Sequence, residues 1–222
     1  RTTPSLSSAA SDVYKRQDLA RYSPPGQRVR GLYVTVNRFY ASVLNAVKED
    51  IRRSLLKRRR SLSKEELKQV SCEINTHLIN EIQNRDLKKI LVYQSIDNEP
   101  SIEQTTELAW QKDIEVYIPK VISKEKIIIN RLRKNSSYSK NKFGIKESND
   151  LDTVELAEID LAVLPLVGID INGFRLGYGG GYYDRFFNQE SELSRKPFII
   201  GAGYAFQVLE VSFAEDHDLK CD

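Results

Sequence analysis

The sequence LPLVGIDINGFRLGYGGGYYDRFF at residues 164–187 contains six of the eleven glycines in the chain. The apolar run at 161–167 predicts a buried strand, the glycines predict a tight loop, and 182–188 predicts the first turns of a helix. Glycine lets backbone N–H groups converge on phosphate oxygens, and a helix start adds unpaired donors and a positive dipole end. The stretch therefore predicts a strand, a loop and a helix with an anion-binding site at their junction.

The residues around the glycines favour a binding function over a purely structural turn, which is the alternative for any glycine-rich loop. The spacing matches neither the P-loop motif nor the dinucleotide-binding motif. Arg175 stands at the entrance of the loop and can add a bidentate contact to the same anion. Phenolic, carboxylate and cationic groups follow the glycines at Tyr182, Tyr183, Asp184 and Arg185.

The rest of the chain alternates helical and strand patterns. A basic amphipathic helix is predicted over 48–61, and the capping box Ser63-Lys-Glu-Glu66 opens a second helix that runs to about Asn84. Further strands are expected at 90–94, 115–118, 127–132 and 198–203, with helices at 102–111 and 206–210 and a surface excursion at 133–150. This order predicts an α/β fold, a single three-layer α/β/α domain with a mostly parallel sheet.

The topology also predicts where a ligand binds. In open α/β sheets, ligands gather beyond the carboxyl ends of the strands. Asn98-Glu99 and the glycine loop each follow a predicted strand directly. We therefore expect the two loops to share one crevice.

The N-terminal segment differs in composition from the remainder. Residues 1 to about 30 are rich in Ser, Arg and Pro, so we expect disorder there; residues 32–47 are a short helix or more of the same extension. The predicted division is 1–46 as an extension and 47–222 as the domain. The extension superficially resembles an organelle transit peptide. Because the chain begins at Arg1 and contains no methionine, a translated upstream sequence is the favoured interpretation, and the predicted compartment is the cytoplasm, with an organelle as the alternative.

Composition narrows the function classes. The chain has 222 residues, 40% of them hydrophobic, and no apolar run of about 18 residues, so we expect no membrane partner. Residues 1–47 hold seven basic and two acidic groups, which leaves 27 basic and 29 acidic in 48–222. That balance gives the domain no basic field for nucleic acid, and the run Lys57–Arg60 is interpreted as a solvated helix C-terminus. Cys72 and Cys221 are expected to be unrelated reduced thiols.

Residues 173–187 closely resemble the signature of the 5-formyltetrahydrofolate cyclo-ligases, also called 5,10-methenyltetrahydrofolate synthetases. The resemblance runs from about Val47 to the end of the chain. It is carried further by 48–52, 58–63, 93–99, 118–121, 143–147, 201–207 and His217-Asp218.

A few positions depart from the family pattern. Ser148, Pro100 and Phe213 stand where other residues are commoner, and none of them removes a chemical group from the expected site. Some members carry Arg and Lys at the positions of Tyr178 and Gly180. That difference places more of the phosphate's charge neutralisation on Arg175, Lys48 and Arg52.

The resemblance implies ATP- and Mg²⁺-dependent conversion of 5-formyltetrahydrofolate to 5,10-methenyltetrahydrofolate, with release of ADP and phosphate through a phosphorylated formyl (imidate) intermediate. It implies catalytic roles for Arg175 and Tyr182. Magnesium would be held by Asp184 and Asp218. The folate would be bound by Gln94, Glu99 and Tyr182, with Phe206 and Gln207 as further candidates for the pocket wall. ATP would be bound by Lys48, Arg52, Arg175, Leu176, Gly177, Tyr178, Gly179, Gly180, Gly181, Tyr182 and Tyr183.

Two other functions remain open at this point. One is a non-catalytic module of similar fold that binds a nucleotide or sugar phosphate, which needs the glycine loop but neither Glu99 nor Lys48. The other is an inactive paralogue, against which the joint presence of Arg175, Asp184 and Glu99 argues. The expected partners are small-molecule substrates, and the expected oligomeric state is a monomer.

Overall fold

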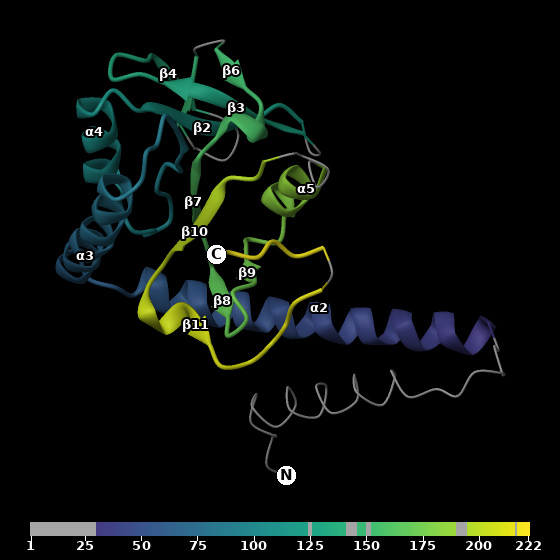
Figure 1. Cartoon of the computed structure of the whole chain (residues 1–222). Coiled ribbons are helices and arrows are strands. Elements are labelled where there is room, and N and C mark those ends of the chain that lie inside the picture. The colour runs from purple at the N-terminus through teal and green to yellow at the C-terminus, as the bar shows by residue number, and fades with distance from the viewer. Residues whose placement is uncertain (1–29, 124–125, 141–145, 150–151, 190–194, 216) are drawn as a thin grey trace.

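The computed structural model describes residues 30–123, 126–140, 146–149, 152–189, 195–215 and 217–222 (Figure 1). The expected disorder of residues 1–29 lies outside the described residues. No helix among the described residues is long and apolar enough to span a membrane. Cys72 is exposed, Cys221 is buried, and both are free thiols.

A six-stranded sheet forms the centre of the domain, in the order β10-β7-β1-β2-β3-β6. Its strands are β1 (Lys89–Leu91), β2 (Glu115–Val121), β3 (Ile127–Leu132), β6 (Thr153–Val154), β7 (Leu161–Pro165) and β10 (Phe198–Ala202). Strands β10, β7, β1 and β2 pair in parallel, and β3 is antiparallel to both of its neighbours. The turn at 122–126 is too short for a parallel crossover, so β3 must return against β2. The predicted mostly parallel sheet is confirmed.

The two faces of this sheet are covered by different helices, because side chains alternate along each strand. Ile90 and Val92 point to the core beneath α3 (Lys64–Gln83) and α4 (Glu103–Gln111). Leu91, between them, belongs to the second core, which is closed by Phe187 of α5 (Tyr182–Gln189). The three-layer arrangement follows from this alternation.

The glycine-rich stretch contributes two strands to a small second sheet that the sequence did not predict. It has the order β11-β8-β9, from β11 (Val208–Leu209), β8 (Gly168–Asp170) and β9 (Arg175–Leu176). Buried Asp170 closes the turn between β8 and β9, because its Oδ1 accepts from the backbone N–H groups of Asn172 and Phe174 at 2.9 Å each. Gly173 completes the turn with φ +86°.

A long helix, α2 (Arg30–Arg60), packs on this second sheet rather than on the central one (Figure 1). A Cβ on Gly168 of β8 would stand 3.0 Å from Cδ1 of buried Leu55, so the absent side chain lets helix and strand approach. The helix is continuous through 30–46, where the sequence left open a short helix or more of the extension. Propagating an established helix costs far less than starting one. The predicted boundary at 46/47 falls inside α2 and stays a prediction.

Other element predictions were close, with specific corrections. The capping box is present: Ser63 Oγ accepts from Glu66 N at 3.2 Å and Glu66 Oε2 accepts from Ser63 N at 2.7 Å. The region expected as a plain surface excursion includes the paired strands β4 (Tyr138–Lys140) and β5 (Lys146–Ser148). The helix predicted at 206–210 was wrong in part: a short 3-10 helix, η2 (Ala205–Gln207), leads directly into β11. A second one, η1 (Leu156–Glu158), precedes β7.

Candidate functional site

A cleft of about 1050 Å³ lies between the glycine loop, the loop after β1, one face of α2 and the C-terminal segment. Apart from Phe206 and Gln207, every residue predicted for the site lines it, although these residues come from segments far apart in the chain. They are Lys48, Arg52, Gln94, Glu99, Arg175, Leu176, Gly177, Tyr178, Gly179, Gly180, Gly181, Tyr182, Tyr183, Asp184 and Asp218. The expectation of one shared crevice is met, while the individual roles stay predictions.

The glycine loop takes conformations that favour glycine. Gly179 and Gly181 have φ of +94° and +62°, and α5 begins at the next residue, Tyr182. Side chains with a Cβ are strained at such angles. Arg185 steadies the loop from α5 by donating from Nη2 to the Gly180 carbonyl at 2.9 Å. The loop therefore presents its backbone to the cleft directly in front of a helix N-terminus.

Arg175 lies beneath this loop and is nearly buried, with 4% of its surface exposed. Its guanidinium donates to the Pro165 carbonyl at 3.3 Å and to Asp184 Oδ1 at 3.3 Å, and it stacks over Tyr183 with 5.0 Å to the ring centre. Its Nε is buried without a hydrogen-bond partner among the described residues. A buried cationic donor left unpaired beside a cleft is suited to an anionic ligand.

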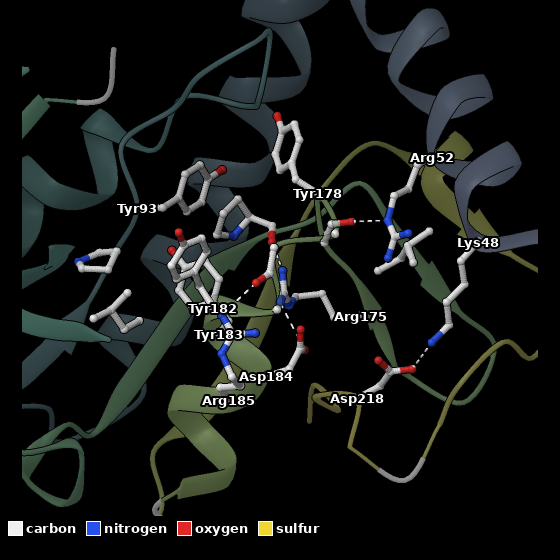
Figure 2. Close-up of a pocket in the computed structure, with 18 of the residues that line it drawn as sticks. Lys48, Arg52, Tyr93, Arg175, Tyr178, Tyr182, Tyr183, Asp184, Arg185 and Asp218 are labelled. Carbon is white, nitrogen blue, oxygen red and sulfur yellow. Dashed lines mark hydrogen bonds and ion pairs between the residues drawn. The ribbon is translucent and has the colours of Figure 1, made fainter. Parts of the chain in front are cut away.

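Lys48 and Arg52 project from one face of α2, as their four-residue spacing predicted (Figure 2). Nζ of Lys48 makes ion pairs with Glu215 Oε2 at 2.8 Å and Asp218 Oδ2 at 2.6 Å. Arg52 donates from Nε to the Gly177 carbonyl at 2.8 Å, so it braces the glycine loop. In this arrangement both cations already hold parts of the site in place.

The two carboxylates predicted to bind magnesium both face the cleft (Figure 2). Asp184 accepts from Arg175 and from Leu219 N at 3.2 Å, and both bonds fall on Oδ1. Asp218 stands with Glu215 and His217 in a group whose ligand atoms all lie within 4.8 Å of one another. Carboxylate oxygens that face a cleft beside a helix N-terminus fit Mg²⁺, which takes one or two carboxylates together with phosphate oxygens.

Glu99 is the buried acid of the opposite wall, 6% exposed. Its Oε2 accepts from Ile96 N at 3.0 Å, while Oε1 has no hydrogen-bond partner in the described part of the chain. Burial raises the pKa of Glu99 to about 7, against the lowering effects of the Ile96 N–H and the Arg59 charge. A buried acceptor with a free oxygen invites a ligand that carries N–H donors.

The wall around Glu99 is largely apolar. Tyr93 and Ile96 from the loop after β1 line it together with Ile118, Val121 and Ile127 from β2 and β3. Tyr93 is held by a hydrogen bond from its hydroxyl to the Pro100 carbonyl at 2.7 Å. The cleft therefore has a glycine-lined half with paired basic and acidic side chains and an apolar half with one buried acid.

Two expectations at the edge of the site were wrong. Gln207 does not line the cleft: it is buried and holds η2, donating from Nε2 to the Leu166 and Val167 carbonyls. Phe206 stacks on Tyr204, with 5.4 Å between ring centres, and lies under the Arg58 guanidinium. Both side chains shape the backbone after β10 and do not line the pocket.

The interpretation of Lys57–Arg60 as a solvated helix end was also wrong for one residue. Arg59 is fully buried and donates to the Asp97 carbonyl at 2.9 Å and the Leu166 carbonyl at 3.2 Å. The spacing 48, 52, 55 and 59 places Arg59 on the same helix face as buried Lys48 and Leu55. That periodicity was the signal that could have found it.

A cleft formed by a glycine loop, a helix N-terminus and buried basic side chains, beside a mostly parallel sheet, places the protein among α/β proteins that bind anionic ligands. The comparisons with known proteins narrow this class. The family model described as the 5-formyltetrahydrofolate cyclo-ligase family matches residues 44–222, and the chain belongs to that family.

Relatives and solved structures agree with this placement. The chain is 31% identical to the 5-formyltetrahydrofolate cyclo-ligase of Haemophilus influenzae over 73% of its own length and 88% of that protein. It is similar to a solved 5,10-methenyltetrahydrofolate synthetase from Mycoplasma pneumoniae, with a TM-score of 0.66, 31% identity and coverage of 79% and 95%. The Aquifex aeolicus 5,10-methenyltetrahydrofolate synthetase gives a TM-score of 0.69 at 29% identity, with coverage of 79% and 87%.

Proposed function

We propose that this enzyme converts 5-formyltetrahydrofolate to 5,10-methenyltetrahydrofolate and that ATP drives the reaction, with ADP and phosphate as the other products. The observation that carries the proposal is the division of one cleft into a half beneath the glycine loop, where the buried Nε of Arg175 lacks a hydrogen-bond partner among the described residues, and an apolar half with buried Glu99. A triphosphate suits the first half, and a pterin suits the second. The reacting groups would meet where the two halves join.

The phosphate half supplies charge and backbone donors. Arg175 and the amides of Gly177 to Gly181 would bind the triphosphate, and Lys48 and Arg52 would support them from α2. The formyl oxygen is a weak nucleophile, so catalysis depends on holding it in line with the γ-phosphate and neutralising the spreading charge. Arg175 and Tyr182 would act at the reacting atoms.

The folate half supplies recognition. The free oxygen of Glu99 would accept from the amino and ring N–H groups of the pterin, with Gln94 and Tyr182 as neighbouring contacts. The formyl oxygen takes the phosphoryl group and gives a phosphorylated imidate. The neighbouring folate nitrogen then attacks the same carbon and loses its proton, and the oxygen leaves within inorganic phosphate.

Asp184 and Asp218 would hold Mg²⁺ against the phosphates. When bound, Mg²⁺ neutralises part of the negative charge on the transferring group. Arg175 keeps one oxygen of Asp184 engaged, and Lys48 keeps one oxygen of Asp218 engaged, so both carboxylates are oriented before any ligand arrives.

We also propose that the enzyme works as a cytoplasmic monomer, which size-exclusion chromatography and fractionation of its source cells would test.

The direct test is to mix the protein with 5-formyltetrahydrofolate, ATP and Mg²⁺ and to follow the near-ultraviolet absorbance of methenyltetrahydrofolate. We expect a rise that requires ATP and is lost in Arg175→Ala. The matched control is Arg195→Ala, because Arg195 is an exposed arginine remote from the cleft whose ion pair is with Asp160. A folded wild-type protein that binds ATP and gives no rise would favour a non-catalytic binding module.

A further inference from the structure

Arg59 is the one wholly buried arginine among the described residues, and its contacts reach two separate loops. Its Nε donates to the Asp97 carbonyl at 2.9 Å and its Nη2 lies 3.4 Å from the Asp97 carboxylate. The same Nη2 donates to the Tyr178 hydroxyl of the glycine loop. Its Nη1 donates to the Leu166 carbonyl and lies 3.9 Å from Glu99 Oε1.

The loop that Arg59 holds turns through two left-handed residues. Asp97 and Asn98 have φ of 49° and 59°, a conformation that Asp and Asn adopt more readily than other residues with a Cβ. Several contacts hold this turn in place. Arg59 and Arg60 bind the carbonyl and carboxylate of Asp97, and the Tyr204 hydroxyl donates to the Asn98 carbonyl at 2.8 Å. The backbone N–H of Glu99, the next residue, donates to the Ile96 carbonyl at 2.8 Å.

Tyr178 is the residue of the glycine loop that contacts Arg59. It belongs to the glycine loop, is 44% exposed, and its ring centre lies 5.3 Å from the Arg59 guanidinium carbon. Arg59 itself is not among the residues that line the cleft. The planar guanidinium of Arg59 donates hydrogen bonds to both loops at once, which the single ammonium of a lysine cannot reproduce.

We propose that Arg59 is a positioning residue: it ties the Asp97–Glu99 loop to Tyr178, so that the folate wall and the phosphate loop are assembled as one site. This inference deepens the proposed function and rests on it for its catalytic consequence. Its structural consequence can be tested without measuring turnover: a change in one loop must alter the amide exchange of the other.

Amide hydrogen exchange tests that consequence directly. We expect Arg59→Lys to speed exchange both at 96–99 and at 177–181, while Arg58→Lys, an exposed neighbour on the same helix, changes neither. If Arg59→Lys does not fold, Tyr178→Phe tests the same link between the loops, because it removes only the hydroxyl that interacts with Arg59 and Glu99. It is expected to speed exchange of the Ile96–Glu99 segment. Unchanged exchange across the cleft in a folded variant overturns the proposal.

Turnover measurements distinguish a positioning role of Arg59 from a general effect on the stability of the protein. The charged and titratable groups facing Glu99 are Arg59, Asp97, Tyr93, Tyr178, Tyr183 and Tyr204. Because Arg59 is the cation among them, Arg59→Gln should move the acidic limb of the ATP-dependent kcat/KM profile to higher pH. Arg59→Lys keeps the charge, so it should leave the limb in place while lowering kcat/KM about 10- to 100-fold through misplacement.

The outcomes distinguish the two proposals. A wild-type protein without turnover, but with coupled exchange between the loops, refutes the proposed reaction and supports the role of Arg59. Wild-type turnover with an Arg59→Gln profile identical to that of the wild type refutes the role of Arg59 and leaves the reaction standing.

Discussion

At the scale of single residues, Glu99 connects the chemistry of the site to its stability. Its folded-state pKa of about 7 lies above the ordinary glutamate value, so the folded protein binds more protons than the unfolded chain between those two values. Stability should therefore fall as pH rises through that window. The cost of ionising the buried acid is up to about 3 kcal/mol above pH 7.

Glu99→Gln should remove that pH dependence and weaken folate binding, because the amide is neutral and offers a weaker acceptor. The measurement is urea unfolding of the wild type and variant at pH 5 and pH 8, with Glu103→Gln on the exposed start of α4 as the control. Equal pH dependence in the wild type and Glu99→Gln would show that Glu99 does not titrate in this window.

Arg59 shows where single-residue prediction reached its limit. Four consecutive basic residues, Lys57 to Arg60, look equivalent by residue type, and only the helical phase that Arg59 shares with Lys48 and Leu55 distinguishes it for burial. The lining of the cleft was easier to predict, because glycines, an arginine and a carboxylate lie together in one short stretch of sequence.

At the scale of elements, the helix starts follow local chemistry closely. The Ser63–Glu66 capping box satisfies two backbone donors at the start of α3, which packs on the central sheet away from the cleft. Ser63→Ala should lower the free energy of unfolding by about 1 kcal/mol. Ser63→Asp, which retains a capping oxygen, should restore it, and turnover should be unchanged in both. Urea unfolding and the absorbance assay check this; reduced turnover in stable Ser63→Ala would contradict it.

Strand and helix types were predictable because β1, β2 and β7 are short apolar runs buried on both faces, while burial recurs at helical spacing along α3. The β8–β9 hairpin was not predicted, because its turn depends on the buried Asp170 side chain and its partner strand β11 is distant in sequence. The continuation of α2 back to Arg30 could not be predicted from the local sequence either, because residues 32–47 fitted both a short helix and a continuation of the N-terminal extension.

At the scale of the whole molecule, the C-terminal segment joins the two sheets. Leu219 accepts from Arg175 N at 2.9 Å, and Cys221 donates its N–H to the Gly173 carbonyl at 2.9 Å beside β9. On the other side, Asp222 exchanges hydrogen bonds with Ile199 of β10. Lys48 ties the preceding turn to α2 through Asp218. These contacts fix the glycine loop relative to the central sheet.

Deleting residues 219–222 should therefore destabilise the domain by about 3 kcal/mol or more, since several backbone hydrogen bonds are worth about 1 kcal/mol each. It should also abolish ATP binding, because Arg175 and Asp184 lose their backbone partner. Lys220→Ala, an exposed change in the same segment, is the control. Isothermal calorimetry with ATP and thermal unfolding provide the readouts, and full ATP affinity in the deletion variant would refute this role.

In the proposed reaction, the formyl oxygen of the folate attacks the γ-phosphate of ATP directly within this cleft. A single turnover with 5-formyltetrahydrofolate labelled with ¹⁸O in the formyl group, followed by mass spectrometry of the phosphate released, tests this step. The proposed reaction predicts that the label appears in inorganic phosphate. Phosphate without label, alongside normal formation of methenyltetrahydrofolate, would contradict it.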